Sequence, residues 1–128
     1  MPRDPAKNPL DDRIRVQHML EAARDVAALA AGRSLDDLRT SMPVRRAMVN
    51  AIQEIGEAAA KVSPLGRARI PGVPWGVVVG MRNRLVHGYD EINIEVVWKV
   101  ATEEVHGLIT ALESACASWP LSEPGREY

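Results

Sequence analysis

Apolar residues recur at three- and four-residue steps along most of this 128-residue chain, which is the spacing of amphipathic helices. The first helix is expected to begin near Asp11 or Asp12, because either side chain can cap free backbone N–H groups. It is expected to stop before Gly32, since glycine commonly follows the last residue of a helix. Its predicted inward face consists of Val16, Met19, Leu20, Ala23, Val26, Ala27 and Ala30.

Two capping patterns mark the starts of the next helices. Ser34 and Asp37, three residues apart, resemble a capping box for a short helix that continues to about Arg39. Ser41 stands two residues before Pro43, and proline is favoured in the first turn of a helix. The helix that begins there has an apolar stripe made of Val44, Met48, Ala51, Ile55, Ala58 and Val62.

Prolines and glycines interrupt the middle of the chain. Ser63-Pro64 is expected to end the second long helix. Residues 64–74 contain three prolines and two glycines, which predicts an ordered loop. A helix is then predicted from about Trp75 to about His87, where Gly88 breaks it.

A last long helix is predicted towards the C-terminus. Asp90 or Asn93 can cap its start, and Trp119-Pro120 closes it, because proline lacks the N–H that a helix needs. Its predicted inward positions are Val97, Val100, Ala101, Val105, Leu108, Leu112 and Ala115.

Together these segments predict an all-α protein, an antiparallel up-and-down bundle of four to five helices with short connections. The sequence has no alternating strand pattern, internal repeat or low-complexity tract. We expect a flexible lead-in over residues 1–9, a single helical domain over residues 10–118 and a flexible tail over residues 119–128.

The composition fits closely packed helices and restricts the partners of the protein. Hydrophobic residues make up 46% of the chain, with three Trp, two Tyr and no Phe. The formal net charge is −1 and the pI is about 6.3, whereas proteins that hold nucleic acid by bulk electrostatics carry a basic excess. Any contact with nucleic acid must therefore come from a local patch.

The sequence also indicates the compartment. The single cysteine, Cys116, excludes an internal disulfide and fits a reducing environment. The polar N-terminus has no apolar signal core, and no stretch approaches the roughly 20 apolar residues that span a bilayer. We therefore expect a soluble, cytoplasmic protein without a membrane partner.

The chemistry of the chain is concentrated between Met81 and Tyr89. Arg82 offers a guanidinium that can grip phosphate, and His87 offers an imidazole that moves protons near neutral pH. Together they are the minimum set for metal-free cleavage of a phosphodiester that carries its own 2′-hydroxyl, and Asn83 lies beside them. The alternative interpretation of the same residues is solvated helix charges and packing at a helix end.

The spacing of Arg82 and His87 restricts how they can act together. Each residue of a regular helix turns by about 100°, so two side chains five residues apart diverge by about 140°. Either the helix ends near His87 and the chain turns, or the two side chains line a groove shared with a second copy of the protein. Gly88 favours the first solution and is compatible with the second.

Polar residues outside this segment carry weaker hypotheses. Glu57 either fixes a motif arginine through an ion pair or is simply solvated. Arg45-Arg46 and Arg67-Ala68-Arg69 either extend a phosphate-binding surface or form solvated faces, and His18 and His106 are expected to be exposed or to pack between helices. The chain has no zinc-ligand spacing, no phosphate-cradling glycine-rich loop and no nucleophile beside a base, so we expect neither a metal nor a cofactor.

Three blocks of the chain, in their order and spacing, resemble the HepT family. Its members are the toxins of the MntA–HepT toxin–antitoxin systems, within the HEPN superfamily. The resemblance extends from about Asp11 to Leu112, and Arg82, His87 and Tyr89 fit the family pattern of arginine, four residues, histidine, one residue, tyrosine. The three blocks are Ile55–Ala59, Pro71–Trp75 and Gly80–Asp90.

The resemblance implies a fold, an assembly and an activity. The fold would be a HEPN-like helical bundle, which forms a homodimer whose two motifs face one another across a cleft. The activity would be a metal-independent endoribonuclease that cleaves RNA such as tRNA or mRNA. In it Arg82 and His87 would be catalytic and Asn83 would support them, while Arg84 is a further candidate for RNA contact.

The resemblance also implies a partner. In this family the antitoxin is an MntA-like nucleotidyltransferase, which uses ATP to transfer AMP to the motif tyrosine, here Tyr89. An adenylate beside Arg82 and His87 would add negative charge where an RNA phosphate binds. A different class of function is a non-cleaving nucleotide- or RNA-binding subunit of a nucleotidyltransferase, and a third is a purely structural dimer.

Overall fold

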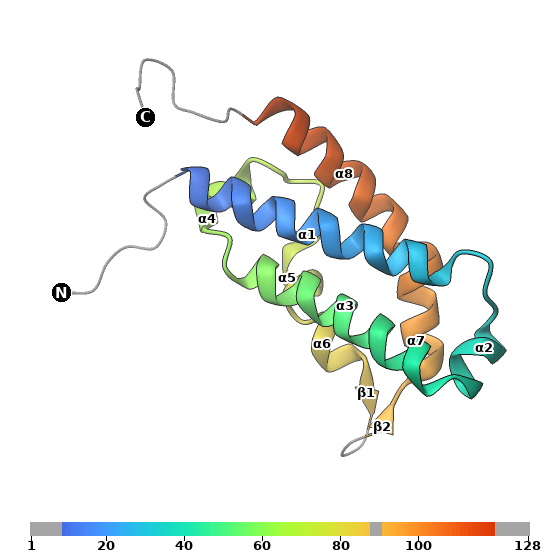
Figure 1. The fold of residues 1–128 in the computed structure, drawn as a ribbon. Helices are drawn as coiled ribbons and strands as arrows, with labels where there is room; N and C mark the ends of the chain where they lie inside the picture. The colour runs from blue at the N-terminus through green and yellow to red at the C-terminus, as the bar shows by residue number, and fades with distance from the viewer. Residues whose placement is uncertain (1–8, 88–90, 120–128) are drawn as a thin grey trace.

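Three long helical stretches form the framework of the structure, a computed structural model that describes residues 9–87 and 91–119 (Figure 1). Helix α1 (Pro9–Ala30) lies between α3 (Met42–Ala60) and α8 (Val105–Ser118), and both neighbours run antiparallel to it. The predicted all-α, antiparallel bundle is confirmed. The shorter elements are α2 (Leu35–Thr40), α4 (Pro64–Ala68), α5 (Trp75–Val79), α6 (Met81–Arg84), β1 (Val86–His87), β2 (Glu91–Ile92), α7 (Ile94–Lys99) and the π-helical turn η1 (Val100–Glu104).

The predicted apolar faces form the core. All the inward positions expected for the three long helices are buried except three, which are half-buried: Ala27, Val44 and Ala115. Burial of these side chains is the main force that holds the bundle together, because isolated helices of this length are marginally stable in water.

The local capping signals are confirmed as well. Ser34 and Asp37 form both halves of a capping box at α2, and the Ser41 side chain accepts a hydrogen bond in the first turn of α3. Gly32 has a positive φ of 76°, which glycine adopts without strain after a helix end. Asn93 caps α7, whereas the alternative cap, Asp90, lies outside the described residues.

The predicted cap of the first helix is wrong. Helix α1 already includes Pro9, so Asp11 and Asp12 lie inside its first turns rather than before them. The Asp12 carboxylate is buried and accepts hydrogen bonds from the Ser63 backbone N–H at 2.9 Å and the Ser63 hydroxyl at 2.5 Å. A buried carboxylate requires hydrogen-bond donors, and the donors of Asp12 belong to a residue 51 positions later in the chain.

This contact organises a helix where a loop was expected. The Ser63 hydroxyl also accepts a hydrogen bond from the Gly66 N–H at 3.0 Å, and Pro64 follows as the first residue of α4. Residues 64–74 therefore begin with one helical turn and become irregular only after Ala68.

The continuous helix predicted from Trp75 to His87 is also wrong. It breaks at Gly80 into α5 and α6, ends at Arg84, and gives way to β1, which pairs antiparallel with β2. Close packing of α5 on α3 depends on Gly56, because a Cβ atom there would lie 3.2 Å from the Val78 carbonyl oxygen.

The last helix is continuous but not regular. Helix α7 passes through the π-helical turn η1 into α8, which ends at Ser118 as expected. The extra residue of a π turn rotates the side chains that follow relative to those before it, so η1 sets which side chains face the rest of the bundle.

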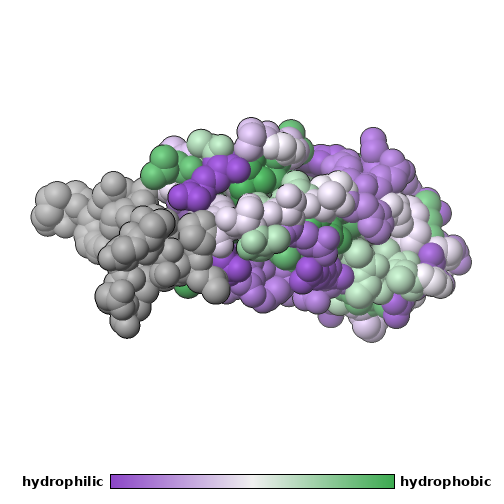
Figure 2. All heavy atoms as spheres, turned by 90° about the horizontal axis from the view of Figure 1, so that it is seen from above, coloured by the Kyte–Doolittle hydropathy of each residue, from purple (hydrophilic) through white to green (hydrophobic). Residues whose placement is uncertain are grey.

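The surface mixes polar and apolar residues. On the face seen from above, hydrophilic and hydrophobic side chains form interspersed patches (Figure 2). Within residues 9–87 and 91–119, no helix is long and apolar enough to span a bilayer. The Cys116 thiol is half-buried, and burial raises its pKa, which favours the protonated thiol.

Candidate functional site

Helix α6 presents the first residues of the motif to solvent. Met81 and Leu85, one turn apart, are buried in the core and fix the orientation of this short helix. Arg82 and Asn83 lie on the opposite side and are exposed. Arg82 forms no ion pair or hydrogen bond with any described side chain, so its guanidinium is available to an anion.

The chain leaves the helical path before it reaches His87. Helix α6 ends at Arg84, and in the two-residue ladder that follows Val86 pairs with Ile92 and His87 with Glu91. Of the two arrangements considered for Arg82 and His87, the structure shows the one in which the helix ends and the chain turns. The helix ends at Arg84, three residues before the expected end at His87. The His87 side chain and residues 88–90, among them Gly88 and Tyr89, lie outside the described part of the structure.

Asn93 joins this hairpin to the bundle. Its N–H donates to the Leu85 carbonyl at 2.7 Å, and its side chain accepts from the Val96 N–H at 3.3 Å. Its own carbonyl accepts the N–H of Val97 at 3.0 Å. One residue therefore closes the base of the hairpin and starts α7.

Arg84, two residues after Arg82, forms an ion pair with Glu104. The two terminal guanidinium nitrogens of Arg84 donate to the two Glu104 carboxylate oxygens at 2.8 and 2.9 Å. This hydrogen bonding lowers the pKa of Glu104, against the opposing effect of partial burial, and raises the pKa of Arg84. Glu104 is the last residue of η1, so the π turn aims the carboxylate at α6. That RNA contacts Arg84 stays a prediction, and the structure gives this arginine an intramolecular partner.

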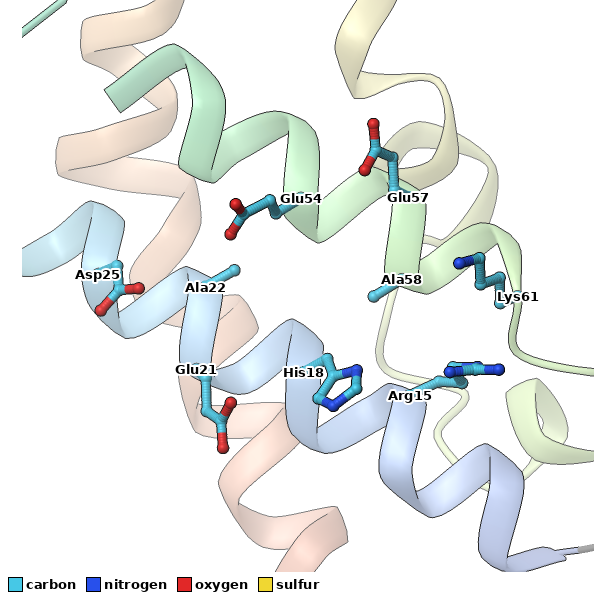
Figure 3. Close-up of a pocket in the computed structure, with 9 residues that line it drawn as sticks. All are labelled: Arg15, His18, Glu21, Ala22, Asp25, Glu54, Glu57, Ala58 and Lys61. Carbon is cyan, nitrogen blue, oxygen red and sulfur yellow. The ribbon is translucent and has the colours of Figure 1, made fainter. Parts of the chain in front are cut away.

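Glu104, rather than Glu57, forms an ion pair with an arginine of the Met81–Tyr89 segment, and that arginine is Arg84. Glu57 is exposed and lines a groove between α1 and α3, where Figure 3 shows it on the same wall as Glu54. No ion pair joins Glu57 to an arginine among the described residues. The hint that the sequence offered for Glu104 was the polar run Thr102-Glu103-Glu104 within an otherwise apolar helix.

Two further arginines have structural roles. Arg67 donates to the carbonyls of Val62 at 3.1 Å and Ala59 at 3.3 Å, and its guanidinium lies 5.6 Å from the centre of the Trp75 ring. It thereby satisfies carbonyls at the end of α3. Arg69 lies over the Trp119 ring at 4.8 Å, which is a cation–π contact.

The remaining histidines lie outside the motif, and both His18 and His106 are exposed. His18 lines the α1–α3 groove and lies between Arg15 and Glu21 along α1 (Figure 3). Even so, no three His, Cys, Asp or Glu side chains of the described chain are arranged to hold a metal ion.

The site thus combines an exposed guanidinium and carboxamide on α6 with a histidine in the adjoining strand. Arginine can bind a phosphodiester in two-point fashion, and histidine can take up or release a proton at neutral pH. In the same segment, Arg84 pairs with Glu104, and the Leu85 carbonyl accepts a hydrogen bond from Asn93.

Comparison with known proteins finds relatives over most of the chain. The family model described as "Ribonuclease HepT-like" matches residues 19–115. The chain is 33% identical to "Putative RNase MJ1380" of Methanocaldococcus jannaschii, over 68% of this chain and 80% of that protein. It is 28% identical to "Putative RNase TTE0752" of Caldanaerobacter subterraneus subsp. tengcongensis, over 70% of this chain and 80% of that protein.

A third relative is "Probable ribonuclease HepT" of Thermococcus cleftensis, which is 27% identical over 57% of this chain and 66% of that protein. No solved structure gives a significant match.

Proposed function

This chain belongs to the HepT-like ribonuclease family, and we propose that it is a metal-independent endoribonuclease that cleaves RNA such as tRNA or mRNA with its Arg-x4-His-x-Tyr motif. The observation that carries the proposal is the exposed Arg82, free of intramolecular partners among the described residues, on a helix that leads directly into the strand of His87.

The reaction follows from the groups present. His87 accepts the proton of the ribose 2′-hydroxyl, whose oxygen attacks phosphorus while the bond to the 5′-oxygen breaks. Arg82 binds the scissile phosphate and stabilises the charge that builds up on it, and Asn83 orients the phosphate or the imidazole. The leaving 5′-oxygen takes up a proton, and the product carries a 2′,3′-cyclic phosphate.

A homodimer would supply the second proton-transfer group. In this proposal two copies place their motifs across a cleft, and the His87 of one copy acts as the base while the other protonates the leaving oxygen. The two exposed histidines elsewhere, His18 and His106, are left without a part in the chemistry.

The purified protein is expected to cleave single-stranded RNA in the presence of EDTA and to leave 2′,3′-cyclic phosphate ends. Gel analysis of end-labelled RNA with enzymatic mapping of the product ends measures this. Cleavage that requires an added divalent metal, or products with a free 3′-hydroxyl, would contradict the mechanism.

A protein that cleaves no RNA although its Tyr89 is unmodified would favour the second candidate, a non-cleaving RNA- or nucleotide-binding subunit. The net charge of −1 favours this second candidate, because such a chain has little general electrostatic attraction for RNA.

We further propose that the protein is the toxin of a toxin–antitoxin pair, and that a nucleotidyltransferase antitoxin silences it by transferring AMP from ATP to Tyr89. The tyrosine hydroxyl attacks the α-phosphate of ATP, and pyrophosphate leaves. The attached phosphate would occupy the anion site at Arg82 and exclude RNA.

Incubation with the partner nucleotidyltransferase and ATP should raise the intact mass of the protein by one or more AMP groups and abolish RNA cleavage. The variant Tyr89→Phe serves as the matched control, because it lacks only the hydroxyl oxygen that accepts AMP. An unchanged mass of the wild-type protein, or equal modification of Tyr89→Phe, would rule out this residue as the acceptor.

A further inference from the structure

A groove beside the motif hairpin is lined by two arginines. It has a volume of about 260 Å³ and lies between the N-terminal half of α3 and strand β2. Among the described residues that line it, Arg45 and Arg46 carry charge and none is Asp or Glu. These lining residues are Met42, Arg45, Arg46, Val49, Asn50, Gln53 and Ile92.

The α3 side of this groove is a single helical stripe. Its residues follow one another at steps of three and one, from Met42 to Gln53, so they share one face of α3. Arg45 is held in place by hydrogen bonds to the Arg39 carbonyl at 3.2 Å and to the Met42 sulfur at 3.3 Å. Arg46 is exposed and has no hydrogen-bond partner among the described residues.

The opposite wall of the groove belongs to the motif hairpin. Ile92 pairs across the ladder with Val86, and His87 is the next residue of that strand. Neighbouring strands lie about 5 Å apart, so Ile92 lies directly across from Val86 and one residue along from the partner of His87. The groove therefore adjoins the strand that contains His87.

A second groove on α3 has the opposite electrostatic character. The α1–α3 groove of Figure 3 contains two cations, Arg15 and Lys61, which lie together at one end. Four carboxylates line the rest of it: Glu21, Asp25, Glu54 and Glu57. Asn50, at the edge of the first groove, donates to Glu54 at 3.3 Å and marks where the acidic side begins.

We infer that the α3–β2 groove binds the single-stranded RNA next to the scissile phosphodiester, an inference that rests on the proposed ribonuclease function. Arg45 and Arg46 bind phosphates of the flanking nucleotides through charge-assisted hydrogen bonds. Val49 and Ile92 give the bases an apolar surface, and Gln53 offers an amide to base edges. This groove is the local basic patch that a chain of net charge −1 needs in order to hold RNA.

The test compares Arg45→Gln/Arg46→Gln with Arg15→Gln/Lys61→Gln, which removes two cations from the other groove. For a short single-stranded RNA, the first variant should raise KM about tenfold with little change in kcat. It should also reduce the slope of log affinity against log salt by about 1.4, because two phosphate contacts are lost. The second variant should behave as wild type. The single variant Arg46→Gln, which breaks no bond to the described residues, should give an intermediate KM.

Three results would overturn the inference. The first is an unchanged KM and salt slope in Arg45→Gln/Arg46→Gln. The second is an equal loss of RNA affinity in both double variants. The third is a change in oligomeric mass, measured by light scattering, without weaker RNA binding. The last would make the groove a protein interface. Binding of the same RNA, followed by fluorescence anisotropy, tests the groove even if the wild-type protein does not cleave, so failure of the proposed function is recognised separately.

Discussion

Replacing His87 by alanine should lower the rate of RNA cleavage by about 10²–10⁴-fold, the range that a general acid or base contributes. The loss arises because no other group takes the proton of the 2′-hydroxyl, and the second copy of a dimer loses the same residue. The measurement is single-turnover cleavage of a labelled RNA in EDTA, with circular dichroism and light scattering to show that fold and assembly persist.

The chain supplies its own controls for this experiment. His18→Ala and His106→Ala remove exposed histidines outside the motif, and each should cleave RNA at the wild-type rate. Retained activity in His87→Ala, or an equal loss in either control, would show that the imidazole at position 87 does not perform the proton transfer.

Replacing Glu104 by alanine should lower the free energy of unfolding by about 1–2 kcal/mol, between the values typical of exposed and of buried ion pairs. It should also reduce kcat by roughly tenfold, because α6 loses its brace and small displacements of reacting groups are costly. Urea unfolding and cleavage kinetics measure the two effects. Glu103→Ala, which removes the exposed carboxylate next in sequence, should change neither.

Exchanging the two charges tests whether the Arg84–Glu104 ion pair itself, rather than the packing of either side chain, maintains kcat. Arg84→Glu combined with Glu104→Arg should recover part of the kcat lost in either single variant, since an ion pair can form again in the reverse sense. If the swapped protein stays as impaired as the single variants, the pair does not act through its mutual contact.

The same pair makes stability depend on pH. The pKa of Glu104 in the folded protein is below its ordinary value, chiefly because Arg84 donates hydrogen bonds to the carboxylate. Its stabilisation is therefore complete above the pKa of the unfolded chain, about 4.3, and is lost as the pH falls through the lower folded value. The stability difference between wild type and Glu104→Gln should be constant at neutral pH and shrink as the pH falls below about 4.3.

Local chemistry explains what the sequence could predict of the fold. The capping box of Ser34 and Asp37, the cap at Ser41 and the positive φ of Gly32 all depend on residues within one turn, and each is found as expected. The apolar faces were equally accessible, because a 3.6-residue period is visible in the sequence itself.

Contacts between distant residues explain the errors. Asp12 was expected to cap its own helix, but it binds Ser63 and so creates α4. Glu57 was considered as the partner of a motif arginine, but the π turn η1 brings Glu104 to Arg84 instead. The periodicity of apolar residues does not show which residues far apart in the sequence come into contact. It also does not show where a helix contains the extra residue of a π turn.

The sequence was sufficient to select the candidate site residues, but it did not predict which residues surround them. Arg82 and Asn83 are exposed, and because α6 ends at Arg84, His87 does not lie on the same helix as Arg82. The roles of His87 and Tyr89 stay predictions that the experiments above address.

The hydrogen bond from Asn93 to the Leu85 carbonyl anchors the base of the motif hairpin to the bundle. This 2.7 Å bond joins buried Leu85 to the residue that caps α7, so both ends of the hairpin are held by residues outside it. Transfer of AMP to Tyr89, as proposed above, would then act on a segment whose base is fixed, and it would not require the protein to unfold.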